Sequence, residues 1–382
     1  MIISHIKLKN WRNFRVVKVP LSDRVFIVGP NASGKSNFLD AMRFLRDISK
    51  PGGGLQKAVE DRGGISKIRC LAARQYPDIE FSVSFSEPPN SDLLWKYEIG
   101  IKQEPRGYRQ PHISYEKAWK GSEQVLSRPD EHDKKDKLLL TQTHLEQIAA
   151  NQPFREIAMF FASISYMHLV PQLVRYPKSF SGPGLPGDPF GLNFLEQVSK
   201  TRERSRKNRL RKIEDALKVA VPQLNELSFV QDESGIPHLE ALYEHWRPKG
   251  AKQREDQFSD GTLRLLGLLW TLLDGDSLLL FEEPELSLNS GIVNRLASLI
   301  YRIQKQRKRQ VILSTHSADL LSDKGIGSEE VLLLIPSMEG TTIKAASTII
   351  EIQELLNHGM SIGEAALPYT SPPDISQLEL FR

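Results

Sequence analysis

Residues 29–36, GPNASGKS, place glycines, a lysine and a serine at a spacing that can hold phosphate groups. They fit the pattern G-x-x-x-x-G-K-[ST] at every fixed position. Backbone N–H groups of residues 31–35, at the start of a helix, can cradle phosphate oxygens. Lys35 would neutralise phosphate charge, and the Ser36 hydroxyl would ligate Mg²⁺. This segment therefore predicts a site for a nucleoside triphosphate with magnesium.

Two acidic residues follow an apolar run in LLLFEEPE at 278–285. Open α/β sheets place their ligands beyond the carboxyl ends of their strands. Glu282 would hold Mg²⁺ directly or through water, and Glu283 would orient and deprotonate an attacking water. Two adjacent acids are also compatible with a solvated strand end. Their combination with the phosphate loop favours the catalytic interpretation.

A third segment, QFSDGTLRLLGLLWTLL at 257–273, begins a strongly apolar helix. Ser259, Asp260 and Gly261 stand at its N-terminus, where free N–H groups and the helix dipole can bind an anion. A serine or aspartate in this position is also an ordinary helix cap. The segment is more specific because the acidic pair follows it about twenty residues later.

Taken together, the three motifs resemble those of ABC-type ATPases, in particular the branch that contains SMC proteins, RecF and OLD-family ATPases. The resemblance covers residues 1–50 and 255–335. It implies an α/β fold of the ABC-type P-loop NTPase class, with a mixed central sheet, an antiparallel β-subdomain and a mainly helical insertion. It also implies ATP and Mg²⁺ as cofactors and a homodimer that encloses two ATP molecules.

The resemblance assigns roles to individual residues. FSDGT corresponds to the signature motif, so that Ser259 and Gly261 would act in trans on the nucleotide of the partner subunit. SLN at 287–289 resembles the loop that contacts the partner, and His316 in STHSADLL resembles the switch histidine. The expected nucleotide-binding residues are Gly29, Asn31, Ala32, Ser33, Gly34, Lys35, Ser36, Asn37, Arg12 from LKNWRNF, Ser259 and Gly261; the expected catalytic residues are Glu283 and His316, and the expected metal ligands are Ser36 and Glu282.

Three features depart from the family pattern. Glu282 stands where transporter-like members usually have aspartate; a glutamate at this position is common in OLD-like ATPases and should not abolish metal binding. Gln56, Gln75 and Gln103 all compete for the role of the lid-loop glutamine. Only 66 residues follow His316, which is too few for the nuclease domain of OLD proteins. We therefore expect a stand-alone ATPase whose nuclease or toxin effector is a separate chain.

The chain is long enough for two domains, or for one domain with a large insertion. The expected division is residues 1–103 and 257–365 as the two lobes of the ATPase, 104–256 as a largely helical insertion, and 366–382 as a flexible tail. Strands are expected over 2–11, 16–28, 79–86 and 94–102, and helices over 35–46, near 143–162 and over 193–220.

Composition is that of an ordinary globular protein, with 40% hydrophobic and 26% charged residues. No apolar stretch approaches the length of a membrane span, and the start lacks the pattern of a signal peptide, so a cytoplasmic protein without membrane partners is expected. The single cysteine, Cys70, excludes an internal disulfide framework and a cysteine-based zinc site.

Two further segments indicate partners. Residues 200–212, KTRERSRKNRLRK, carry eight cationic residues and one acid, which can be a DNA-binding face or an ordinary solvated helix face. The tail sequence QLELF resembles the motif that docks repair proteins on the bacterial sliding clamp, through Gln377, Leu378, Leu380 and Phe381. The alternative is a tail packed on its own domain.

The expected function is ATP-driven dimer closure that acts on or senses DNA, as the ATPase of an anti-phage defence system. A RecF-like role in DNA repair and recombination is the alternative. Two other classes remain open from sequence: a transport module and a nucleotide-dependent scaffold without turnover.

Overall fold

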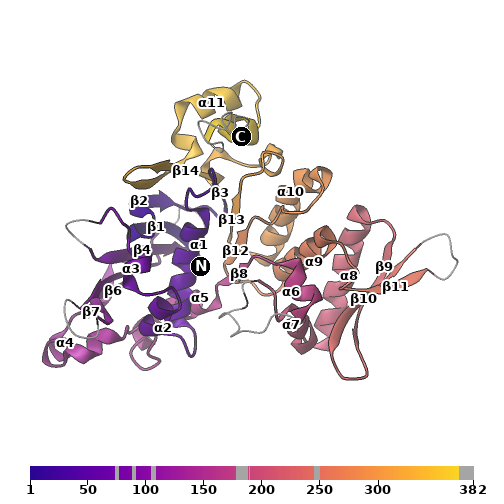
Figure 1. Cartoon of the computed structure of the whole chain (residues 1–382). Helices are drawn as coiled ribbons and strands as arrows, with labels where there is room; N and C mark the ends of the chain where they lie inside the picture. The colour runs from indigo at the N-terminus through magenta and orange to yellow at the C-terminus, as the bar shows by residue number, and fades with distance from the viewer. Residues whose placement is uncertain are drawn as a thin grey trace, which may run out of the picture. The chain divides into compact units, whose positions relative to one another are not determined.

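The computed structural model describes residues 1–369 except 74–76, 88–91, 105–108, 178–187, 189 and 245–249. The chain forms two compact units. Unit 1 is Met1–Ser165, Ser277–Leu280 and Arg309–Arg382, and unit 2 is Tyr166–Asp276 and Phe281–Lys308. Figure 1 shows the elements of both units. The clamp-like tail sequence lies outside the described residues.

An antiparallel sheet with the strand order β2-β1-β4-β5-β6-β7 forms one part of unit 1 (Figure 1). Buried and less buried residues alternate along β4, as expected for a sheet with one face against the core. This sheet confirms the expected antiparallel part of the fold. Its strands are β1 (Ile2–Trp11), β2 (Phe14–Pro20), β4 (Ile79–Ser86), β5 (Trp95–Gln103), β6 (Pro111–Lys120) and β7 (Glu123–Arg128).

A mixed sheet has the order β15-β14-β3-β13-β12-β8. Both β13 and β14 pair with β3 in parallel, and β15 pairs with β14 in antiparallel fashion. Every residue of β3 and β13 is buried, as is typical of parallel strands covered on both faces. The strands are β3 (Arg24–Val28), β8 (Ser165–Met167), β12 (Leu279–Glu282), β13 (Val311–Thr315), β14 (Val331–Ser337) and β15 (Gly340–Ala345).

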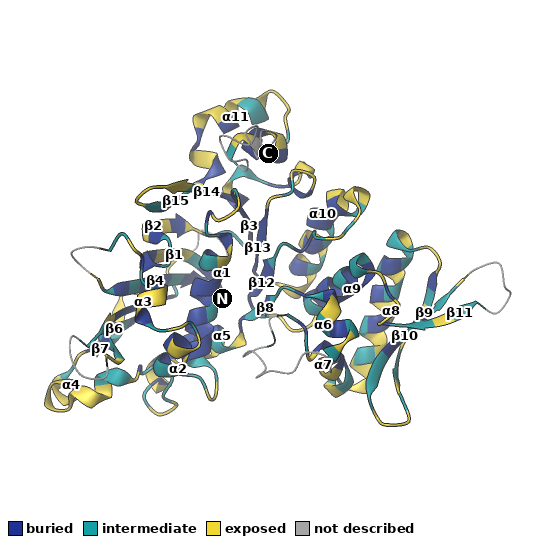
Figure 2. Cartoon of the chain, viewed as in Figure 1, coloured by how far each residue is buried: buried dark blue, intermediate teal, exposed yellow. Residues whose placement is uncertain are grey.

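Helix α1 (Lys35–Ser49) contacts strands of both sheets, β1 and β13, and also packs against α5 (Arg155–Ser163). Trp11, Phe44 and Phe81 form an aromatic cluster between α1 and the antiparallel sheet, with ring centroids 5.1–5.4 Å apart. Figure 2 shows α1 as largely buried. The other helices of unit 1 are α2 (Leu55–Glu60), α3 (Ile65–Ile68), α4 (Glu131–Lys135), α11 (Ile350–Asn357) and α12 (Ile362–Ala366).

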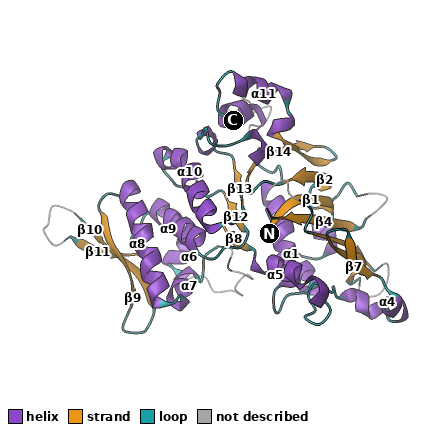
Figure 3. Cartoon of the chain, turned by 180° about the vertical axis from the view of Figure 1, so that it is seen from behind, coloured by secondary structure: helices purple, strands orange, loops and turns teal. Residues whose placement is uncertain are grey.

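Unit 2 combines helices with a three-stranded antiparallel sheet of the order β11-β10-β9 (Figure 3). Helix α9 (Asp260–Leu273) is its most buried helix and contacts α6, α8 and α10. No helix in the described part of the chain is long and apolar enough to cross a membrane. The remaining elements are α6 (Pro171–Arg175), α7 (Phe194–Lys200), α8 (Glu203–Ala220), α10 (Ser290–Arg307), β9 (Leu224–Gln231), β10 (Pro237–Tyr243) and β11 (Ala251–Arg254).

Two element predictions were wrong in detail. The strand expected over 16–28 is two strands in different sheets, because the chain turns after Pro20, where the Leu21 N–H bonds to the Ser4 carbonyl. The helix expected near 143–162 is formed only from Arg155. The preceding residues form separate turns, and the buried Glu116 carboxylate accepts the N–H groups of residues 144 and 145.

The segment 104–256 is less helical than expected. Strands β6 and β7 extend the antiparallel sheet of unit 1, and β9–β11 form the sheet of unit 2. The expected helix over 193–220 is two helices, α7 and α8, separated at Thr201 and Arg202. The proposed four-part division of the chain stays a prediction.

Candidate nucleotide site

The phosphate-binding loop of unit 1 connects β3 to α1. Gly34 has a φ of 101°, in the left-handed region that favours glycine. A Cβ at this position would lie 2.1 Å from Nδ2 of Asn13, so a larger residue would displace that side chain. Lys35 is buried, and its Nζ donates to the carbonyl of Gly29 at 2.9 Å. The lysine thus folds back over the loop.

Asn13 and Thr341 hold this loop from behind. Both side chains donate to the carbonyl of Ser33 at 2.8 Å, and the amide of Asn13 also donates to the Thr341 hydroxyl. Asn37 donates to the side-chain oxygen of Asn13 at 2.9 Å. Asn37, expected to bind nucleotide, therefore supports the loop through Asn13. The network links the β1–β2 turn, the loop and β15.

Several residues of the loop are accessible to a nucleotide phosphate. Asn31, Ala32 and Ser36 are exposed. The hydroxyl of Ser33 is buried and has no hydrogen-bond partner among the described residues. Buried polar atoms without partners carry a free-energy cost, which an incoming oxygen atom can relieve. A glycine loop at a helix N-terminus supplies the remaining donors.

His316 lies in the same unit, directly after β13. Thr315 pairs with Val28 at the ends of the parallel strands β13 and β3, so residues 316 and 29 leave the sheet at the same edge. The His316 side chain is exposed. This placement suits the expected switch role, which stays a prediction.

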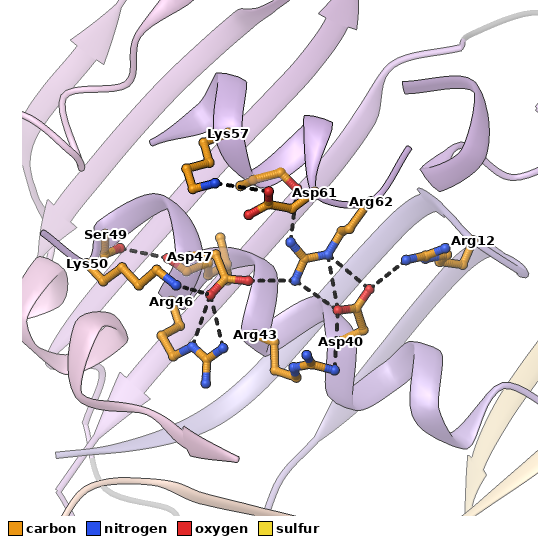
Figure 4. Close-up of polar contacts among 12 residues, drawn as sticks. Arg12, Asp40, Arg43, Arg46, Asp47, Ser49, Lys50, Lys57, Asp61 and Arg62 are labelled. Atoms are coloured by element: carbon orange, nitrogen blue, oxygen red, sulfur yellow. Dashed lines mark hydrogen bonds and ion pairs between the residues drawn. The ribbon is translucent and has the colours of Figure 1, made fainter. Parts of the chain in front are cut away.

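Arg12 belongs to a network of buried charges beside α1 (Figure 4). Its Nη2 donates to Oδ2 of Asp40 at 2.9 Å. Arg62 donates to both oxygens of Asp40 and also to Asp47. Asp47 further pairs with Arg46 at 3.0 Å. The expected contact of Arg12 with nucleotide stays a prediction, and Asp40 fixes the side chain that would make it.

The charges of this network compensate each other. Burial alone would raise the pKa of Asp40, but Arg62, Arg43 and Arg12 outweigh burial and lower that pKa below its ordinary value. The pKa of Asp47 is lowered in the same way by Arg46 and Arg62 against the effect of burial. Both carboxylates are therefore charged at neutral pH.

The signature segment in unit 2 starts helix α9. The Ser259 hydroxyl caps the helix by accepting the Thr262 N–H at 3.1 Å. A Cβ at Gly261 would lie 2.7 Å from the backbone oxygen of Ser287, so the signature turn and the 287–289 loop meet backbone to backbone. The ordinary capping role of Ser259 is thus present. The glycine adds a close approach that capping alone does not require.

The first acid of the pair, Glu282, ends β12. The Tyr166 hydroxyl donates to its Oε2, and Nδ1 of His168 donates to its backbone carbonyl at 3.1 Å. Glu283 follows with a φ of 45°, an uncommon conformation for a non-glycine residue. Such backbone strain is frequent at functional sites.

The donor set fits magnesium in a particular way. The described residues contain no group of three or more His, Cys, Asp or Glu side chains that could hold a metal ion. Mg²⁺ is usually held by one or two protein oxygens together with substrate phosphates and water. That Ser36 and Glu282 supply such oxygens stays a prediction.

Arg264 follows one turn after the signature residues. Its Nε is buried without a hydrogen-bond partner in the described part of the chain. Burial lowers its pKa, and Asp260, Glu283 and Glu285 act against that shift. A cation therefore lies within electrostatic reach of the second acid in unit 2, which the sequence did not reveal.

None of the three candidates for the lid-loop glutamine is singled out. Gln56 donates its amide to the carbonyls of Pro111 and Thr141, both at 2.7 Å. Gln103 donates to the carbonyl of Arg109 at 3.1 Å. Gln75 lies outside the described residues. The lid glutamine stays open.

Sequence reasoning missed several supporting side chains. Asn13 is the second asparagine of the quoted LKNWRNF, and its position after a strand was a usable signal. Asp40, Tyr166 and Arg175 carried no such signal, because their contacts lie far away along the chain.

Comparison with known proteins places most of the chain within one protein-family model. The family model "AAA domain, putative AbiEii toxin, Type IV TA system" matches residues 24–323. Endonuclease GajA of Bacillus cereus (strain VD045) is 49% identical over 47 residues, 12% of this chain and 8% of that protein. The DNA replication and repair protein RecF of Brucella abortus (strain 2308) is 35% identical over 86 residues, 20% of this chain and 21% of RecF. The matches thus span only a small part of these relatives.

Two solved structures share the fold over almost their whole length. A SmcHead bound to the C-winged helix domain of ScpA has a TM-score of 0.55 at 17% identity, covering 90% of this chain and 98% of that one. A Pyrococcus furiosus Smc head domain with an extended coiled coil, bound to the C-terminal domain of ScpA, has a TM-score of 0.53 at 14% identity, covering 93% and 99%. At such identities the likeness establishes the fold alone, which is that of an ABC-type P-loop NTPase. The chain belongs to the matched AAA-domain family and is an ABC-type ATPase of the SMC/RecF/OLD-like branch.

Proposed function

We propose that the protein hydrolyses ATP as a dimer in which each subunit lends its signature turn to the nucleotide of its partner. The observation that carries this proposal is the close approach of Gly261 to Ser287. This approach joins the signature turn to the loop that we expect to contact the partner. A monomeric phosphate-binding protein would not need these two segments to lie together.

Each motif has a definite role in this scheme. Lys35 and the loop N–H groups bind the phosphates, and Ser36 and Glu282 would hold the metal ion. Mg²⁺, when bound, neutralises charge that develops on the phosphates. Glu283 positions the water and accepts its proton, while His316 contacts the γ-phosphate. Ser259 and the N–H of Gly261 complete the partner's site.

The decisive variant is Glu283→Gln, which keeps the size of the side chain and removes the base. We expect ATP to convert this variant into a stable dimer, measured by sedimentation, with loss of phosphate release. Loss of the base removes a contribution of about 10²–10⁴-fold to the rate. Lys35→Ala in the same background is the control and should remain monomeric with ATP.

Two results would contradict this proposal. A Glu283→Gln protein that stays monomeric at saturating ATP would exclude the ATP-enclosed dimer. A wild-type protein that dimerises with ATP but releases no phosphate would instead favour a scaffold without turnover. A transport module is disfavoured by the exposed cations of α8 and would be supported by co-purification with a membrane subunit.

We further propose that dimer closure acts on or senses DNA in anti-phage defence, together with a separate effector chain and in the cytoplasm. The local similarity to endonuclease GajA and the family description support this role. The similarity to RecF favours a repair function as the second candidate. Preference for gapped over blunt duplex DNA, without any protection against phage infection, would favour repair.

A further inference from the structure

Residues 166–175 of unit 2, here called the strap, connect Glu282 with the signature turn. At one end, Tyr166 donates to the Glu282 carboxylate and His168 to its carbonyl. At the other end, Nη1 of Arg175 lies 2.6 Å from Oδ1 of Asp260. The strap thus contacts both motifs through side chains within one unit.

Arg175 clamps the backbone around Ser259. Its Nη2 donates to the carbonyl of Phe258, the residue before Ser259, while Nη1 pairs with Asp260, the residue after it. The Arg175 side chain is 15% exposed, so the guanidinium is mostly withdrawn from water. A planar fork that binds two acceptors fixes orientation better than a single charge. Gln172 adds a weak contact to the second oxygen of Asp260, at 3.5 Å.

The middle of the strap lies directly on the signature helix. A Cβ at Gly267 would approach Cδ1 of Leu169 to 2.3 Å, so the glycine makes room for the leucine. One turn further on, the Thr271 hydroxyl donates to the sulfur of Met167 at 2.8 Å. The strap therefore follows α9 from the signature turn toward the helix C-terminus and has little freedom to move independently of it.

We infer that the strap positions the catalytic motifs for two different nucleotides: Tyr166 orients the metal-facing carboxylate for the subunit's own ATP, and Arg175 orients Ser259 for the partner's ATP. This inference rests on the proposed dimer. The Tyr166 hydroxyl holds one oxygen of the Glu282 carboxylate. Partners of this kind fix the orientation of a metal ligand. Tyr166 and Arg175 are positioning residues, since neither is placed on the nucleotide itself.

The role of Tyr166 is tested by metal binding, independently of turnover. In the Glu283→Gln background with ATP, Tyr166→Phe should weaken Mn²⁺ binding by about 10-fold or more, as loss of such ligand-orienting contacts typically does. Mn²⁺ binding is read by electron paramagnetic resonance. Tyr301→Phe is the matched control, because Tyr301 is exposed on α10, and it should bind Mn²⁺ as the parent does. Equal affinities in all three proteins would overturn the role of Tyr166.

The role of Arg175 is tested by mixing subunits. Arg175→Gln should lower hydrolysis about tenfold or more, since a small displacement of a catalytic group is costly. Arg302→Gln, exposed on α10, is the control. Mixing Arg175→Gln with Lys35→Ala should restore activity, because one site of the mixed dimer then has an intact loop and an intact partner signature. A mixed dimer of wild type and the Arg175→Gln/Lys35→Ala double variant should contain no such site.

The reverse mixing pattern would overturn the inference, because it would place Arg175 in its own subunit's site. Wild-type rates for Arg175→Gln would overturn it as well. If that variant does not fold, Asp260→Asn removes the same ion pair from a side chain that is 39% exposed. If only this inference fails, the wild-type protein still hydrolyses ATP and dimerises. If the proposed function fails, the wild-type protein does neither.

Discussion

The Asp40 carboxylate interacts with several arginine side chains of unit 1. It is the common acceptor for Arg62 and Arg12, and Arg43 lies 3.9 Å away. Since Arg12 belongs to the β1–β2 turn and Arg62 follows α2, the carboxylate ties two remote segments to the helix that carries the phosphate loop. A buried charge of this kind is stabilising only while its partners remain.

Asp40 gives a prediction about acid. Burial would raise its pKa, but the arginines lower it below 3.8. Because the folded pKa is below the unfolded one, the network stabilises the protein above the unfolded value, and this stability is lost as pH falls through the folded pKa. Asp40→Asn should reduce the free energy of unfolding at pH 7 by about 3–5 kcal/mol and flatten its fall in acid. Urea unfolding at pH 7 and at an acidic pH measures both effects.

The matched control is Asp61→Asn. Asp61 pairs only at the surface, with Lys57 at 3.1 Å, and exposed pairs contribute about 0–1 kcal/mol. Equal losses for the two variants would show that the Asp40 network does not stabilise the fold.

At the scale of elements, α8 has two faces with different tasks. Arg206 stacks on Phe229 with 4.0 Å between its Cζ and the ring centroid, and it donates to the carbonyl of Ser199. Arg209 pairs with Asp274 at 2.7 Å and lies over Trp270 of α9. Two of the eight cations of the charge run thus help to hold unit 2 together, which the sequence pattern alone did not distinguish from a solvated face.

The two faces predict different costs for the same substitution. Arg209→Ala loses the ion pair and the ring contact and should reduce the free energy of unfolding by about 1–2 kcal/mol. Arg211→Ala removes an equal charge from an exposed position and should change it by less than about 0.5 kcal/mol. Thermal melts of both variants measure the difference. Identical melting temperatures would mean that Arg209 is as dispensable as Arg211.

The elements also show what the sequence could predict. The phosphate loop and α1 were placed correctly, because the motif and the strand–loop–helix unit are local in sequence. The sequence pattern predicted β2 and β3 as one strand, because both are largely apolar. They differ in the sheet that each joins, which the local sequence does not show. Likewise, nothing local indicated that the residues before Arg155 would form turns beside the Glu116 carboxylate of β6, which accepts the N–H groups of residues 144 and 145.

At the scale of the whole molecule, the motifs divide between the two units. The phosphate loop and His316 belong to unit 1, while Ser259 and Glu283 belong to unit 2. The short distance along the sequence between the signature and the acidic pair was enough to associate these two motifs. This proximity could not reveal the strap, because residues 166–175 precede the signature by about ninety positions in a segment of unremarkable composition.

The net charge of +4 is too small to attract DNA by itself, so the arrangement of cations decides. The exposed cations of α8 are Arg204, Lys207, Arg211 and Lys212. The first three lie at spacings of three and four residues, along one side of the helix, and Lys212 directly follows Arg211. Arg206 and Arg209 are engaged within unit 2 and should be left intact in any test of DNA binding.

Replacing these four exposed cations with glutamine should weaken binding to duplex DNA and flatten its salt dependence. Each lost phosphate contact reduces the slope of log K against log salt by about 0.9, so the full set would reduce it by about 3–4. Fluorescence anisotropy between low and moderate salt measures both quantities. The matched control replaces four cations exposed on or just after α10, namely Arg295, Arg302, Lys305 and Lys308, and should keep the wild-type slope. If both variants keep it, α8 is a solvated face and DNA contacts the protein elsewhere; if both lose it equally, attraction follows total charge rather than the pattern on α8.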